Sequence, residues 1–197
     1  MRTLILSLFA ICSFTFVSAQ FPSVTIQDID GKNINSNTLS EHDGPIVVSF
    51  WALWCKPCIQ ELMAINDAYI DLEEDYNLKL YAVSIDDARN ATKVKSFVNG
   101  KAWDFEVLLD QNSDFKRAMN VNNVPHSLLL TPDGRIVKQH TSYVPGDEEI
   151  LYEEIAKLYE DLQNDKGETQ GSSDAQKRQT RPDAEQLRMK RDKRGDR

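Results

Sequence analysis

Two cysteines close the stretch Phe50-Trp51-Ala52-Leu53-Trp54-Cys55-Lys56-Pro57-Cys58. The apolar run Ile46–Trp51 overlaps the start of this stretch and predicts a buried strand. The residues after it predict an amphipathic helix, because apolar side chains recur at spacings of three and four from Leu62 to Leu72. The sequence therefore places a Cys-x-x-Cys pair where a strand passes into a helix, which is typical of a redox-active dithiol.

This junction predicts different roles for the two cysteines. Unpaired backbone N–H groups and the macrodipole favour negative charge at a helix N-terminus, so a thiol there ionises more readily to the attacking thiolate. We expect Cys55 to be the nucleophile that forms a mixed disulfide with a substrate, and Cys58 to resolve it. Pro57 suits the first helical turn because it lacks an N–H. Lys56 either stabilises the thiolate or is an exposed charge without effect.

Metal binding is the main alternative use of such a pair. A structural zinc site normally has four protein ligands and a catalytic one has three. The chain has three cysteines and three histidines, with no second closely spaced pair. We therefore predict redox chemistry, with no metal and no bound cofactor.

The N-terminus predicts export. Arg2 is followed by an apolar run to Val17 and by the small residues Ser18-Ala19, which is the pattern of a cleaved secretory signal. The run is shorter than the roughly 20 residues of a spanning helix. We expect residues 1–19 to be a signal peptide and the exported protein to be soluble. Cys12 lies in this segment, and Ile11 before it argues against lipid attachment.

Two further regions follow the signal. Residues 20–164 have the size of one domain, and their hydrophobic core must hold without a separate structural disulfide. Residues 165–197 carry many charges and hardly any apolar residues, which predicts a disordered tail. This tail is either a solvated end or a contact for an anionic surface or for the acidic domain. The formal net charge of −8 gives no basic footprint for nucleic acid. We expect a monomer.

The order of the remaining elements predicts the architecture. Strands and helices alternate and then give way to a closing hairpin and a last helix, which predicts an α/β sandwich about a mixed central sheet with helices on both faces. The expected elements are a hairpin over 23–35, strands over 79–85 and 105–109, helices over 91–98 and 113–119, strands over 127–130 and 136–139, and a helix from Asp147 to Leu162. Asn99-Gly100 is expected to end the helix over 91–98.

The active-site stretch resembles the thioredoxin superfamily, and the element order matches a thioredoxin fold with an N-terminal β-hairpin extension. Over residues 21–162 the chain is similar to TlpA/ResA-type thioredoxin-like disulfide reductases of the bacterial cell envelope. This likeness is carried by the active-site run, Phe21-Pro22, Asp30-Gly31-Lys32 and Thr131-Pro132-Asp133-Gly134. It implies a thiol–disulfide oxidoreductase of the periplasm or envelope that reduces disulfides of exported proteins and receives electrons from a membrane thiol relay.

The resemblance also implies a substrate-binding loop. Val124-Pro125 is similar to the family's cis-proline loop, whose backbone pairs with an extended substrate like an added strand. Trp54 is expected to form apolar surface beside the cysteines. His126 follows the proline where many thioredoxins have Thr. It is a charge partner, a metal ligand or a polar residue at the strand edge.

Glu61 is the third candidate for catalysis. It lies three residues beyond Cys58, so the two side chains share one face of the helix. ResA-type proteins carry an acid at this offset, which implies that Glu61 relays the proton of the resolving thiol from a partly buried site with a raised pKa. The alternative is a solvated glutamate in a first helical turn. Many thioredoxins have a buried Asp in the preceding strand, and that position is Ser49 here.

Two other functions stay open at this point. A thiol peroxidase shares the N-terminal hairpin, but its motif has Thr three residues before the reactive cysteine, where this chain has Ala52. A copper chaperone would hold Cu(I) between Cys55, Cys58 and His126, since thiolates select Cu(I). Related copper-handling proteins space their cysteines by three residues, and here the spacing is two.

Overall fold

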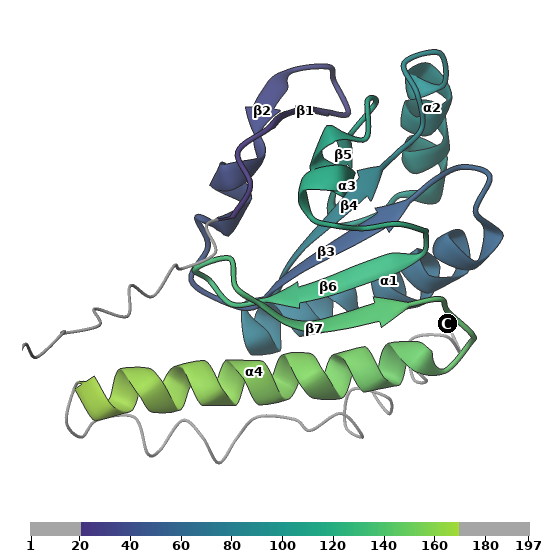
Figure 1. Ribbon diagram of the computed structural model, residues 1–197. Helices are drawn as coiled ribbons and strands as arrows, with labels where there is room; N and C mark the ends of the chain where they lie inside the picture. Colours follow the sequence, from purple (N-terminus) through teal and green to yellow (C-terminus); the bar gives the residue numbers. More distant parts are fainter. Residues whose placement is uncertain (1–20, 170–197) are drawn as a thin grey trace, which may run out of the picture.

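The computed structural model describes residues 21–169, which form one seven-stranded sheet in the order β2-β1-β5-β4-β3-β6-β7 with helices on both faces (Figure 1). The strands are β1 (Thr25–Asp28), β2 (Asn33–Asn35), β3 (Ile46–Trp51), β4 (Lys79–Ser84), β5 (Glu106–Leu109), β6 (His126–Leu130) and β7 (Ile136–Thr141). The helices are α1 (Lys56–Tyr76), α2 (Ala91–Lys101), α3 (Asp114–Ala118) and α4 (Asp147–Thr169), with a 3-10 turn η1 (Ser36–Ser40). The mixed sheet and the N-terminal hairpin confirm the predicted thioredoxin fold.

Strand direction determines where the candidate site lies. Strands β3, β4 and β5 are parallel, whereas β6 is antiparallel to β3 and β7 is antiparallel to β6. Near the end of β3, Phe50 pairs with His126, and His126 in turn pairs with Thr141 at the end of β7. The end of β3, the start of β6 and the end of β7 therefore meet at one end of the sheet, where α1 begins.

Side-chain alternation sorts the core into two layers. Val47 and Trp51 of β3 pack with α1, α2 and α4, whereas Ile46, Val48 and Phe50 pack on the other face with α3 and the N-terminal hairpin. Because successive side chains of a strand point to opposite faces, the faces of polar residues can be assigned in the same way. Every residue of β3 is buried, as its continuous apolar run predicts.

Helix α2 ends later than predicted. Gly100 does not stop it. The helix continues to Lys101, and Ala102 takes the left-handed conformation (φ 49°) and donates its N–H to the Val98 carbonyl. The next residue, Trp103, packs edge-on against Trp51 with ring centroids 5.1 Å apart. An aromatic pair of this kind contributes about 0.5–1.5 kcal/mol beyond its buried area, so tertiary packing outweighs the local glycine signal.

Both ends of the chain extend beyond the described residues. The expected signal peptide (1–19), with Cys12, lies outside the described residues, as do positions 170–197 of the expected tail. Helix α4 reaches Thr169 and so continues past the domain boundary expected at residue 164. No helix within residues 21–169 is long and apolar enough to cross a membrane.

Candidate active site

The two cysteines lie at the N-terminus of α1. Cys55 occupies the N-cap position, and Cys58, in the first turn, donates its backbone N–H to Cys55 Sγ at 3.4 Å. Their sulfurs are joined in a disulfide with the Cα atoms 5.3 Å apart. Cys55 keeps 4% of its surface exposed and Cys58 keeps none. A substrate that approaches from solvent therefore reaches Cys55 first.

A buried carboxylate holds the turn before Cys55. Asp86 is 5% exposed, and its Oδ2 accepts the backbone N–H of Leu53 and the hydroxyl of Ser84, each at 2.9 Å. The N–H of Ile85 is donated to the Trp51 carbonyl at 2.9 Å. The active-site turn is thus tied to the end of β4 through main-chain groups.

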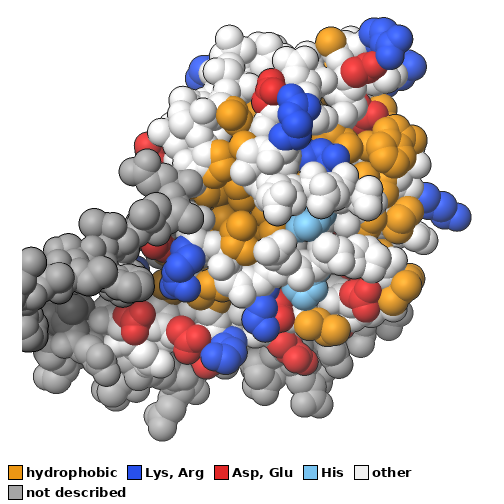
Figure 2. Space-filling view, in the orientation of Figure 1, with side chains coloured by type: hydrophobic (Ala, Val, Ile, Leu, Met, Phe, Trp, Pro, Cys, Tyr) orange, Lys and Arg blue, Asp and Glu red, His pale blue; other side chains and the backbone are white. Residues whose placement is uncertain are grey.

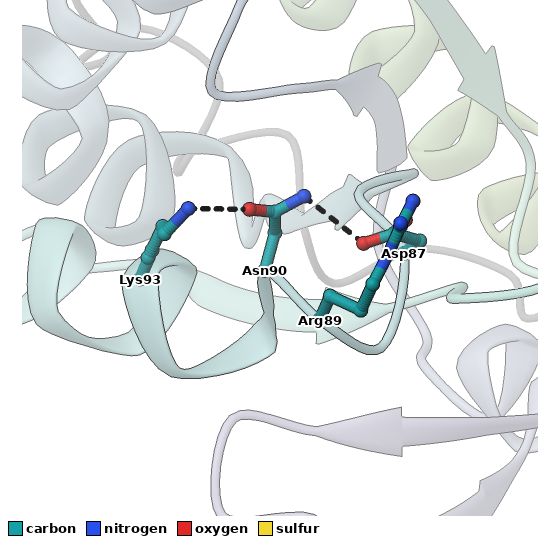
Figure 3. Close-up of polar contacts among 4 residues, drawn as sticks. All are labelled: Asp87, Arg89, Asn90 and Lys93. Carbon is teal, nitrogen blue, oxygen red and sulfur yellow. Dashed lines mark hydrogen bonds and ion pairs between the residues drawn. The ribbon is translucent and has the colours of Figure 1, made fainter.

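The loop that follows Asp86 makes a polar cluster of its own (Figure 3). The Asp87 carboxylate accepts hydrogen bonds from Arg89 and from the Asn90 side-chain amide, and Asn90 Oδ1 accepts one from Lys93 at 2.9 Å. The hydrogen bond from Arg89 lowers the pKa of Asp87. Asp86 is therefore flanked by β4 on one side and by this cluster on the other.

Glu61 is buried, with 5% of its surface exposed. Its Oε1 accepts the Ser127 hydroxyl at 2.7 Å, whereas its Oε2 has no hydrogen-bond partner in the protein. Burial raises the pKa of Glu61 from 4.5 to about 7, against the opposing effects of the Ser127 hydrogen bond and of His140. The structure thus excludes a solvated side chain here, and the raised pKa of Glu61 lies in the range that suits a general acid or base near neutral pH.

Ser127 is a residue of this site that sequence reasoning missed. Besides contacting Glu61, its Oγ lies 3.0 Å from Ser49 Oγ, and the two serines face each other across β3 and β6. Ser127 thus links the acid on α1 to Ser49. A signal was present, because Ser49 and Ser127 are hydroxyl residues in two apolar strands, and buried polar groups need partners.

The loop before β6 lies at the same end of the sheet. The Val124–Pro125 peptide bond is cis, as the resemblance implies, and the Pro125 carbonyl accepts the N–H of Ser142 at 3.2 Å. Because His126 pairs with Phe50, this loop lies beside the strand end that leads to Cys55. Val124 is partly buried and packs against both core layers.

The surface around this end is partly apolar. Figure 2 shows apolar side chains gathered on the right of this face, where β6 begins and β7 ends in Figure 1. Trp54, next to Cys55, is 71% exposed, and Val144, after β7, is 63% exposed. Lys56 is exposed and Pro57 is partly buried. Trp54 thus adds exposed apolar surface next to Cys55.

His126 lies apart from Glu61. It alternates with Ser127 along β6 and so faces the opposite side of the sheet, where its Nε2 lies 3.3 Å from Gln139 Oε1. Burial lowers the pKa of His126. Within residues 21–169 no group of three or more His, Cys, Asp or Glu side chains could hold a metal ion.

Comparison with known proteins agrees with this geometry. The AhpC/TSA family matches residues 17–139, a span that includes both cysteines, Glu61 and the cis-proline loop. The chain belongs to the AhpC/TSA family. Position 52, where a thiol peroxidase carries Thr, is a fully buried alanine in this AhpC/TSA protein, so no hydroxyl is present there.

Relatives of this AhpC/TSA protein include oxidoreductases. The chain is 29% identical over 123 residues to thiol-disulfide oxidoreductase ResA of Bacillus thuringiensis (strain Al Hakam), covering 62% of this chain and 68% of ResA. The solution structure of a thioredoxin-like protein from Porphyromonas gingivalis is 43% identical, with a TM-score of 0.64 over 72% of this chain and 93% of the other. StoA of Bacillus subtilis shares the fold at 23% identity, with a TM-score of 0.54 over 66% and 96%.

Ser127 offers a direct test of how the protein controls Glu61. Ser127→Ala removes the hydrogen bond that opposes the effect of burial, so the pKa of Glu61 is expected to rise by about one unit. A ¹³C NMR titration of the glutamate carboxyl carbons measures this value. Ser96→Ala, on the exposed face of α2, is the matched control and should leave it unchanged. An unchanged Glu61 titration in Ser127→Ala would contradict the assigned contact.

Proposed function

We propose that this protein is a thiol–disulfide oxidoreductase in which Cys55 and Cys58 cycle between dithiol and disulfide. The observation that carries the proposal is the bonded pair at the N-terminus of α1 with a buried carboxyl of pKa about 7 one helical turn further on. The curated relatives named thiol-disulfide oxidoreductase ResA support it.

The proposed reaction has two exchange steps. The Cys55 thiolate attacks a substrate disulfide, which forms a mixed disulfide and releases one substrate thiolate. The Glu61 carboxylate then takes the proton of the Cys58 thiol. The resulting Cys58 thiolate attacks Cys55 Sγ, forms the internal disulfide and releases the second substrate thiolate. The dithiol is oxidised by two electrons, the substrate is reduced by two, and each substrate thiolate takes up a proton.

The substrate would lie along the cis-proline loop. The main chain at Val124 and Pro125 would pair with an extended segment that carries the target disulfide, and Trp54 would cover its apolar side chains. Lys56 and Pro57 would modulate the thiols from the first turn of α1. His126 lies on the opposite face of the sheet from Glu61 and would support the cis-proline loop from that face.

The direction and the compartment are further parts of the proposal. The protein would reduce disulfides of exported proteins in a bacterial periplasm or envelope, with electrons from a membrane thiol relay. Support comes from the similarity to ResA and from the signal-like sequence of residues 1–19. Residues 20–164 would form the working domain of a monomer, and residues 165–197 a charged tail.

Insulin reduction under a chemical reductant tests the activity, and Glu61→Gln tests the relay. The variant is expected to slow the reaction by about tenfold at pH 7. This is less than the roughly hundredfold rate enhancement that acid–base groups typically supply, because water can still accept the proton. The difference should shrink at alkaline pH, where thiols ionise unaided. Glu74→Gln, exposed on the same helix, is the control. Equal rates for Glu61→Gln and parent from pH 5 to 9 would reject the relay, and a parent that binds Cu(I) without reducing insulin would reject the oxidoreductase.

A further inference from the structure

A row of polar side chains crosses the sheet beneath Glu61 and continues to β7. Ser49 pairs with Ser127, and Ser127 pairs with His140 on the next strand. Directly opposed residues project to the same face, so all three lie on the side covered by α1 and α4. His140 is thus the next polar side chain beyond Ser127, and it lies just outside the span that matches the AhpC/TSA family.

His140 is paired on its other side. Its Nε2 lies 2.7 Å from Glu154 Oε2 on α4, and Glu154 Oε1 lies 3.1 Å from Lys138 Nζ. The Lys138 side chain is 56% exposed. A carboxylate beside one ring nitrogen fixes that nitrogen as a donor and leaves the other as the acceptor. The pair lies near solvent on the covered face of β7, because the His140 side chain is 23% exposed and that of Glu154 is 18% exposed.

A cavity joins Glu61 to His140. Both residues line a space of about 330 Å³ between β7, the loop after it and the start of α4. Such a volume accommodates several water molecules, at about 30 Å³ each. The Oε2 of Glu61 is buried without a hydrogen-bond partner in the protein. A polar cavity lined by an ionisable carboxyl can carry a proton through water.

We propose that His140 takes the proton of Glu61 through this cavity and releases it to solvent beside α4. The inference rests on the proposed relay by Glu61. The Glu61 carboxyl becomes a carboxylate, the neutral imidazole becomes an imidazolium stabilised by Glu154, and the imidazolium then gives the proton to bulk water. Histidine side chains exchange protons near neutral pH. Protons thereby leave on the α4 side while the substrate still covers the cis-proline loop.

Other charged groups face Glu61 from each neighbouring element. From α4, Asp147 and Glu148 raise the pKa of Glu61, and His140 on β7 lowers it. From the loop between them, Tyr143 also lines the cavity and donates its hydroxyl to Glu148 Oε2 at 2.8 Å. From β6 only the neutral hydroxyl of Ser127 contacts the carboxyl, and on α1 itself the reduced Cys58 thiol would add a further ionisable group. His140 is therefore the basic group of this set.

The test combines a titration with a rate. In His140→Ala, the pKa of Glu61 measured by ¹³C NMR should rise by about half a unit or more, because a basic neighbour is lost. Resolution of a preformed mixed disulfide with a small chromogenic thiol should slow several-fold at pH 7. Added imidazole should restore part of the rate, since the missing ring leaves a space that adjoins the cavity. His42→Ala, in the loop that precedes β3, is the control and should match the parent with and without imidazole.

The outcomes separate the inference from the relay on which it rests. A parent-like rate in His140→Ala, with Glu61→Gln still slow, overturns the exit through His140 and leaves the Glu61 relay standing. A slow His140→Ala without rescue by imidazole, and with an unchanged Glu61 titration, shows a structural role and also overturns it. A parent-like rate in Glu61→Gln removes the relay itself, and the inference with it.

Discussion

Cys55→Ala is expected to abolish thiol–disulfide exchange, whereas Cys58→Ala is expected to accumulate mixed disulfides. Cys55 is the N-cap of α1 and keeps some exposure, while Cys58 is fully buried in the first turn. Without Cys55 no thiolate is presented to the substrate. Without Cys58 the attack still occurs, but no second sulfur releases the bound partner.

The two variants are compared on a non-reducing gel after exposure to exported proteins. Cys58→Ala should show high-mass adducts that added reductant removes, and Cys55→Ala should show none. The double variant is the control for adducts that do not involve this site. Adducts formed by Cys55→Ala and absent from Cys58→Ala would reverse the two roles.

Glu61→Gln is expected to change how the stability of the oxidised protein depends on pH. The pKa of Glu61 is raised from 4.5 to about 7 in the folded state, so between these pH values the folded protein holds a proton that the unfolded chain has lost. The contribution of this group to stability therefore falls as pH rises from about 4.5 and reaches its full cost above pH 7. Glutamine removes this dependence. Relative to the parent, the variant should gain about 2–3 kcal/mol between pH 5 and pH 9.

Urea unfolding at both pH values measures this difference, with the disulfide kept oxidised so that the thiols do not titrate. Comparing one variant at two pH values cancels the constant cost of placing an amide in the site. Glu74→Gln, on the exposed face of α1, should show a difference near zero. A difference near zero for Glu61→Gln as well would mean that the carboxyl titrates at its ordinary pKa.

The fold and the cysteine pair could be predicted from the sequence because both depend on local pattern. The continuous apolar run of β3 and the three-four spacing of α1 each identify an element without reference to the rest of the chain. The contact of Glu61 with Ser127 could not be found in this way. It depends on the register of β6 against β3. The two residues are 66 positions apart, and the local sequence around each of them does not determine this register. The end of α2 was missed because Trp103 extends the helix by packing, against the local signal of Gly100.

The N-terminal hairpin also affects how the protein behaves among other chains. Without it, β5 would be an edge strand with unpaired backbone groups and the buried apolar residues Leu108 and Leu109. Strand β1 pairs with these two positions, so the three-residue strand β2 forms this edge of the sheet instead. Short edge strands are poor templates for association between chains. The hairpin thereby protects the protein from aggregation, an advantage for one that would work among partly unfolded partners.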